Sequence, residues 1–99
     1  MKTFTERQAD PDPYGYGYSH GMAAVYDAPE DADKDQPPCT IETMAARLRA
    51  IYRPIQLANI LGLDVDQLYH TKEYDEALRK YTEGFCEGWR AEAQAIQQP

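Results

Sequence analysis

Apolar side chains recur every three or four positions between Thr40 and Ile96, which is the period of an amphipathic α-helix. Threonine often caps the beginning of a helix, and proline often ends one. A helix is therefore predicted between Thr40 and Pro54. Its apolar stripe consists of Ile41, Met44, Leu48, Ile51 and Tyr52. One face of this helix is therefore expected to be buried.

Two shorter helices are expected to follow. Pro54 suits the first turn of a helix, and Gly62 supplies the left-handed backbone that a tight turn needs. Asp64 and Gln67 are spaced as a capping box, which predicts a third short helix that ends near His70. The apolar face of the second helix consists of Ile55, Leu57, Ala58 and Leu61.

The longest apolar stripe belongs to a fourth helix, which Thr71 is expected to cap. It consists of Tyr74, Ala77, Leu78, Tyr81, Phe85, Trp89, Ala93 and Ile96. Gly84 and Gly88 lie beside it, although each glycine lowers helix stability by about 1 kcal/mol relative to alanine. Two such positions four residues apart indicate that another backbone approaches closely. That backbone is either the helix expected over 40–53 or a second chain, which would give a homodimer.

The first 38 residues lack this periodicity. They are rich in proline, glycine, tyrosine and aspartate and poor in aliphatic residues, so burial offers little to offset the entropy of ordering. Residues 1–38 therefore predict an extended or disordered acidic arm, and residues 39–99 predict a helical domain. Tyr14, Tyr16 and Tyr18 of the arm are candidate partner-binding residues, because tyrosine offers a large contact area at a small entropic cost.

Residues 54–78 resemble the helix-turn-helix of small phage regulators and phage small terminase subunits. In those families the pattern A-x-x-L-G-apolar is followed by x-L-Y and a long helix. The matching residues are Ala58, Leu61, Gly62, Leu63, Leu68 and Tyr69. The predicted fold class is thus all-α: a small four-helix domain with a helix-turn-helix-like core and an extended, Tyr/Pro/Asp-rich N-terminal arm. A core of about 60 residues is marginal, so self-association or a partner would help it.

Charge separates this chain from such DNA-binding proteins. The net charge is −7: residues 1–38 carry three Lys/Arg against eight Asp/Glu, and residues 39–99 carry seven against nine. Asp64, Asp66, Tyr69 and Glu73 are expected to face outward, where those families usually carry Ser, Thr, Arg, Lys or Gln. At an effective dielectric constant of about 20, the repulsion between a carboxylate and a phosphate about 6 Å apart costs about 2–3 kcal/mol before screening by salt. These residues are therefore expected to bind a protein with a basic surface.

The first functional hypothesis is a non-enzymatic interaction protein that binds and inhibits a basic nucleic-acid-handling protein or complex. Its partner-binding residues would be Asp64, Asp66, Tyr69, Glu73 and the three tyrosines of the arm. In size and acidity the chain is similar to phage-encoded inhibitors, including anti-CRISPR proteins and DNA mimics. This similarity implies a phage or mobile-element protein that acts in the cytoplasm of a bacterial host.

Two alternatives remain open. A DNA-binding regulator or terminase-like oligomer would contact phosphates through Arg47, Arg49, Arg53, Lys72, Arg79 and Lys80. A structural adaptor in a larger particle would lay the tyrosine-rich arm along a neighbouring subunit.

No motif in the sequence indicates an enzyme, a metal site or a cofactor. His20 and His70 lie in different segments, with no cysteine at ligand spacing. Cys39 and Cys86 are too few for a disulfide framework, so reduced thiols in a cytosol are expected. No apolar run has the length of a membrane span, so no membrane contact is expected.

Overall fold

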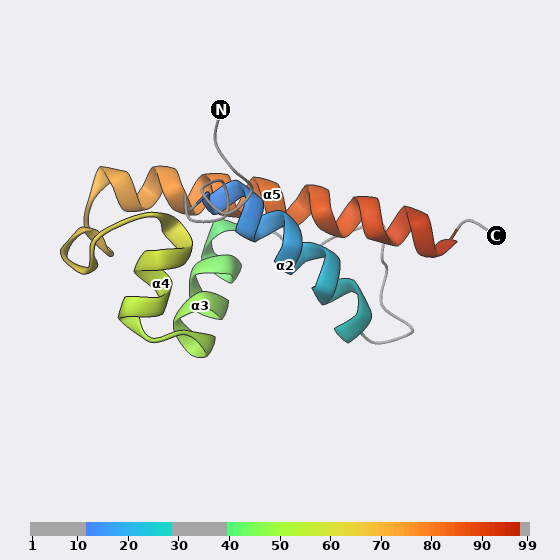
Figure 1. Ribbon diagram of the computed structural model, residues 1–99, viewed down its shortest axis with the longest axis horizontal. Helices are drawn as coiled ribbons and strands as arrows, with labels where there is room; N and C mark the ends of the chain where they lie inside the picture. The colour runs from blue at the N-terminus through green and yellow to red at the C-terminus, as the bar shows by residue number, and fades with distance from the viewer. Residues whose placement is uncertain (1–11, 29–39, 98–99) are drawn as a thin grey trace, which may run out of the picture.

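The computed structural model describes residues 12–28 and 40–97, which form an all-α fold. The described elements are four α-helices and one 3₁₀ turn: α2 (Pro13–Asp27), α3 (Ile41–Ile51), α4 (Pro54–Leu61), η1 (Val65–Gln67) and α5 (Lys72–Gln97). Figure 1 shows α5 along the long axis of the molecule, with α3 and α4 beside its N-terminal half and α2 crossing its middle. The predicted all-α fold class is therefore confirmed.

Helices α3 and α4 begin and end where the sequence predicts. The N–H of Thr43 donates to Oγ1 of Thr40 at 3.1 Å, which confirms Thr40 as the N-cap of α3. Pro54 occupies the first turn of α4, and Gly62 ends that helix with a φ of 70°. The two helices bury Met44, Ala45, Leu48, Leu57, Ala58, Ile60 and Leu61 in the shared core.

Substitution of Gly62 by alanine is expected to lower the free energy of unfolding by about 1–2 kcal/mol, because an L side chain is strained at this left-handed backbone. Urea denaturation followed by circular dichroism measures the change. Gly62→Asn is the control and should recover a large part of the loss, since asparagine tolerates this conformation better. Equal stability of the alanine variant and the wild type would contradict a left-handed backbone at Gly62.

The connection between α4 and α5 differs from the expected third helix. Only Val65–Gln67 form a helical turn, and Oε1 of Gln67 accepts a hydrogen bond from the N–H of Asp64 at 2.9 Å. Tyr69 and His70 then have left-handed φ angles of 67° and 20°, which interrupt any helix at this point. The stretch thus holds a single turn where the resemblance to helix-turn-helix proteins implies a second α-helix.

Residues 13–27 form the α-helix α2, so the prediction of an extended or disordered arm is wrong for this part of the chain. Asp12 caps the helix by accepting a hydrogen bond from the N–H of Tyr14 at 3.1 Å. Pro13 occupies the first turn, where its missing N–H is not needed. The remainder of the predicted arm, 1–11 and 29–38, lies outside the described residues.

Helix α2 packs on α5 through small residues. Its buried positions are Gly17, Gly21, Ala24 and Val25, which share one helical face. A Cβ atom on Gly17 or Gly21 would lie 2.1 Å from a backbone carbonyl oxygen of α5. The stability of α2 therefore comes from close backbone packing, which a count of aliphatic residues does not reveal.

The other half of this contact is made by Gly84 and Gly88 of α5. A Cβ atom there would lie 2.2 Å from the carbonyl oxygen of Tyr14 and 2.1 Å from that of Tyr18, respectively. Gly84 meets Tyr14 and Gly88 meets Tyr18, so the residue numbers rise together along both helices. Helices α2 and α5 therefore run in the same direction. We call Gly17, Gly21, Gly84 and Gly88 the glycine crossing. The close approach predicted at Gly84 and Gly88 is thus made by α2, and the face expected for a homodimer is covered by it.

The apolar stripe of α5 forms the centre of the core. The buried side chains are Tyr74, Ala77, Leu78, Tyr81, Phe85, Trp89 and Ala93. Ile96, the last member of the predicted stripe, is 42% exposed. Thr71 caps α5 as predicted, since its Oγ1 accepts the N–H of Tyr74 at 3.1 Å.

Candidate partner-binding site

Five exposed carboxylates lie where η1 leads into α5. They are Asp64, Asp66, Glu73, Asp75 and Glu76, and we call them the acidic turn. Lys72 is the only Lys or Arg between positions 64 and 76, so this stretch has a net charge of −4. Val65, between the two aspartates, is 47% exposed. Three of the predicted partner-binding residues, Asp64, Asp66 and Glu73, therefore occupy one exposed stretch.

The backbone of the acidic turn is held by groups beneath it. Leu68 is buried in the core, and its N–H donates to the carbonyl of Val65 at 3.1 Å. The hydroxyl of Thr71 donates to the carbonyl of Gln67 and accepts from the first turn of α5. Asp64 and Asp66 are thus presented on a turn of fixed shape, and the other three carboxylates on the helix that follows it, which lowers the entropy that a partner would have to remove.

Tyr69 is placed differently from the prediction. Its ring lies 5.4 Å from the ring of Tyr74, and the guanidinium of Arg49 lies 5.2 Å from its centroid. The side chain is half-buried against the core instead of facing outward. The cause is the left-handed backbone at Tyr69 and His70, which turns the side chain of Tyr69 back toward α3 and α5.

The three predicted tyrosines of the arm do not join the acidic turn. Tyr14 donates a hydrogen bond to the carboxylate of Glu87, which raises the pKa of Tyr14 to about 12. Glu87 lies 14 residues beyond Glu73, or about 21 Å along the helix. Tyr18 is half-buried beside Tyr14, with ring centroids 6.3 Å apart, while Tyr16 is 39% exposed. Tyr14 therefore holds α2 on α5, Tyr18 packs beside it, and only Tyr16 is largely open to a partner.

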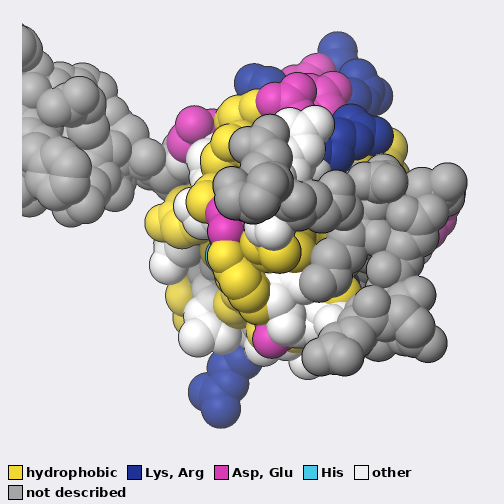
Figure 2. Space-filling model, turned by 90° about the vertical axis from the view of Figure 1, so that its right-hand side faces the viewer, with side chains coloured by type: hydrophobic (Ala, Val, Ile, Leu, Met, Phe, Trp, Pro, Cys, Tyr) yellow, Lys and Arg dark blue, Asp and Glu magenta, His cyan; other side chains and the backbone are white. Residues whose placement is uncertain are grey.

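The six predicted phosphate-contacting residues are all exposed. Arg47 and Arg49 are partly restrained, since the Arg47 guanidinium lies 5.6 Å from the centroid of the Phe85 ring and Arg49 covers Tyr69. The others are Arg53, Lys72, Arg79 and Lys80. Arg47, Arg49 and Arg53 lie on α3 or just after its C-terminal end, and the other three residues lie on the exposed side of α5. In Figure 2, which views the molecule from the C-terminal end of α5, Lys/Arg side chains lie beside Asp/Glu side chains at the upper edge, with hydrophobic side chains over the middle.

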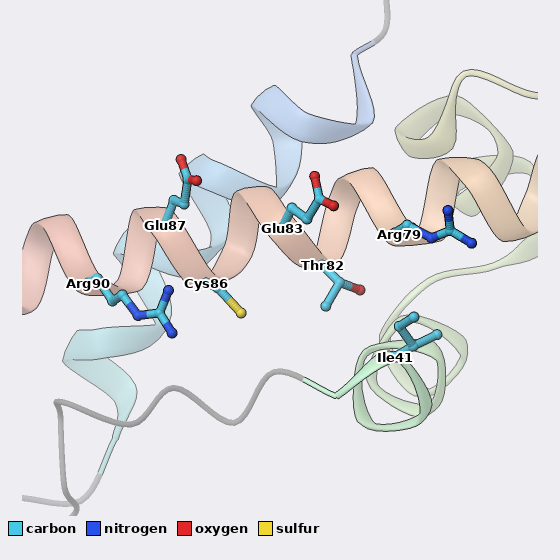
Figure 3. A pocket seen from close by; sticks show the side chains of 7 residues that line it. All are labelled: Ile41, Arg79, Thr82, Glu83, Cys86, Glu87 and Arg90. Carbon is cyan, nitrogen blue, oxygen red and sulfur yellow. The ribbon is translucent and has the colours of Figure 1, made fainter.

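A shallow groove of about 320 Å³ lies between Ile41 of α3 and the middle of α5. Figure 3 shows Thr82 and Cys86 on the side of α5 that faces Ile41, whereas Glu83 and Glu87 point to the opposite side. Arg79 and Arg90 stand at its two ends. Cys86 is half-buried and carries a free thiol. Cys39 lies outside the described residues.

A half-buried polar cluster joins α2, the C-cap of α3 and α5. Nδ1 of His20 and the Tyr81 hydroxyl are hydrogen-bonded at 2.5 Å, and the His20 ring stacks on Tyr52 at 6.0 Å. Burial lowers the pKa of His20, and the positive charge of Arg47 lowers it further. Burial also raises the pKa of Tyr81 above its usual range. The neutral forms of both groups are therefore favoured, and the cluster fixes α2 on the core.

Sequence reasoning missed Gly17, Gly21 and His20 as structural determinants. A signal was available: Gly17 and Gly21 have the same four-residue spacing as Gly84 and Gly88. Two helices that each carry a glycine pair can approach each other at backbone distance. Nothing in the local sequence links His20 to Tyr81, because 61 residues separate them.

Within the ranges 12–28 and 40–97, no helix is long and apolar enough to cross a membrane. The same described residues contain no group of three or more His, Cys, Asp or Glu side chains that could hold a metal ion. No protein-family model, curated protein or solved structure matches this chain.

Proposed function

We propose that this protein is a non-enzymatic interaction protein whose acidic turn binds and blocks a basic nucleic-acid-handling protein in the cytoplasm of a bacterial host. One observation carries the proposal: five exposed carboxylates lie on the η1 turn and at the beginning of α5, in a stretch of chain with a net charge of −4. Complementary charge accelerates association with a basic partner and disfavours wrong partners. A nucleic acid at the same surface would meet like charge.

Reversal of Asp64, Asp66 and Glu73 to lysine is expected to weaken partner binding by about 100-fold or more, because three like-charge contacts cost several kcal/mol. Tagged full-length protein is used to capture proteins from a nuclease-treated lysate of the organism that carries the gene. A protein recovered in stoichiometric amount is then purified, and its affinity for the wild type and the variant is measured by calorimetry.

The matched control reverses Asp27, Glu42 and Glu83, three exposed carboxylates outside the acidic turn. Both triple variants have the same net charge, so an effect of overall charge would weaken binding equally in the two. Loss in the acidic-turn variant alone supports the proposal. Equal affinity of that variant and the wild type would remove the acidic turn as the binding site.

The alternative of a DNA-binding protein draws on the exposure of Arg47, Arg49 and Arg53, which lie on α3 and at its end with no carboxylate between them. Phosphate contacts through these arginines predict an affinity for duplex DNA that falls steeply with added salt. Capture of nucleic acid alone, lost after nuclease treatment, would favour this alternative over the proposed protein partner.

A further inference from the structure

The junction of α3 and α4 exposes apolar side chains beside positive charge. Ile51 is 54% exposed and Ile55 is 68% exposed. A shallow hollow of about 530 Å³ next to them is lined by Arg53, Pro54, Ile55 and Gln56. We call Ile51 and these four residues the basic corner. Isolated exposed apolar residues are ordinary, but a hollow lined by Ile55, with the exposed Ile51 four residues earlier in the chain, offers a surface that a partner can cover.

The positive charge of this region is unopposed locally. Residues 43–63 contain three arginines and no aspartate or glutamate. Arg47 and Arg49 lie over the rings of Phe85 and Tyr69, so Arg53 is the positive charge that the corner itself presents. The corner also has a defined shape: Oε1 of Gln56 accepts the N–H of Arg53 at 3.1 Å, and Pro54 fixes the first turn of α4. An occupant of the basic corner should therefore be acidic, with at least one apolar side chain at its tip.

The acidic turn of the same chain has this chemistry. Val65 is 47% exposed and stands between the exposed carboxylates of Asp64 and Asp66. Oε1 of Gln67 fixes this tip in the same way as Oε1 of Gln56 fixes the corner, by accepting a backbone N–H three residues earlier. The two surfaces are thus complementary in charge, and both are apolar at the centre and fixed in shape.

One molecule cannot join its own two surfaces. The basic corner lies at the beginning of α4 and the acidic turn follows its end. The eight-residue helix between them holds the two apart by about 12 Å. In Figure 1 the junction of α3 and α4 lies at the bottom of the molecule, while the connection to α5 lies at its left edge.

We infer that the acidic turn of one copy docks on the basic corner of a second copy. The contact is heterologous, because it joins two different surfaces, so repetition produces a ring or an open chain of subunits. Partial burial of Val65, Ile51 and Ile55 supplies the apolar part of the contact, and Asp64 and Asp66 lie against Arg53. This inference rests on the proposed function in one respect, namely that the acidic turn is a docking element; it names a further partner, a second copy of the chain.

The test uses purified full-length protein alone, by sedimentation over a concentration series at low and high salt. The wild type is expected to shift from one chain to multiples of it as concentration rises, and to return to one chain in high salt. The turn variant carries Asp64→Ser and Asp66→Ser, and the corner variant carries Ile51→Ser, Arg53→Ser and Ile55→Ser. Each is expected to remain a single chain.

A mixture of the two variants decides the geometry. The turn variant keeps an intact corner and the corner variant keeps an intact turn, so the mixture should form a pair of one chain each and go no further. This result also proves that both variants fold. The control, Glu83→Ser with Ile96→Ser, removes exposed residues elsewhere and should assemble like the wild type.

Three results would overturn the inference: a wild type that stays a single chain, variants that still assemble, or a mixture that forms no pair. None of these decides the proposed function, because that is measured with another protein. Conversely, loss of the lysate partner with retained self-assembly would overturn the proposed function and leave this inference standing.

Discussion

Alanine at both Gly84 and Gly88 is expected to detach α2 from α5. Each new Cβ would lie within 2.2 Å of a carbonyl oxygen, which is backbone and cannot move aside as a flexible side chain does. Overpacking costs about 1–3 kcal/mol, and this contact belongs at the upper end. The better helix propensity of alanine returns about 1 kcal/mol, so we expect a net loss of about 2 kcal/mol per site. Urea denaturation measures the loss of stability, and hydrogen exchange of the α2 amides measures the detachment of α2.

The control for this substitution is Gly15→Ala. It places the same change on α2, but its Cβ would meet only the Asp12 carboxylate, at 3.3 Å. That carboxylate is the end of a flexible side chain, so the variant should be as stable as the wild type or slightly more stable. If the Gly84/Gly88 double variant also kept wild-type stability and protected α2 amides, the glycine crossing would not be what holds α2.

Acidification is expected to destabilise the protein through His20. Its pKa is lowered in the folded state, chiefly by burial and further by Arg47, so the unfolded chain binds the proton more readily. The stability that His20 contributes is therefore fully present above the unfolded pKa of about 6.5 and is lost as pH falls below it. The groups around the His20 ring are Tyr81 of α5, Tyr16 of α2, Arg47 of α3 and Tyr52, the C-cap of α3. Denaturation between about pH 7.5 and pH 5 measures this slope.

Two variants separate the proton from the hydrogen bond. His20→Gln retains a polar side chain but cannot titrate, so its unfolding free energy should vary less between these pH values. Tyr81→Phe leaves Nδ1 of the half-buried His20 without its partner, which should cost about 1 kcal/mol at neutral pH. The same pH slope in the wild type and in His20→Gln would assign the effect to other groups.

The helices that begin and end at strong local signals could be predicted from the sequence. Thr40, Pro54 and Gly62 act through bonds or backbone angles within a few residues, and each occupies the predicted position in the structure. The stripe of α5 could be predicted because it is built from large apolar residues. Helix α2 could not, because its stabilising face consists of glycine, alanine and valine, and its partner lies about 70 residues away in the chain.

The site was predictable to a similar extent. Exposure of Asp64, Asp66 and Glu73 follows from their positions outside the apolar stripes. The orientation of Tyr69 could not be predicted, because it depends on consecutive left-handed residues that are not glycine. The exposure of Ile51 and Ile55 at the basic corner could not be predicted either, because both have the spacing of core residues.

The parallel packing of α2 on α5 has a consequence for how the chain is made. The ribosome adds Asp27, the last residue of α2, to the chain 70 residues before it adds Gln97, the last residue of α5. At about 5–20 residues per second, that interval is roughly 4–14 s. A 15-residue helix with three glycines is not stable alone, so α2 has to wait as an unfolded segment until its partner exists. Its scarcity of large aliphatic side chains, which hides the helix from sequence analysis, also gives chaperones and neighbouring chains little to bind during that delay.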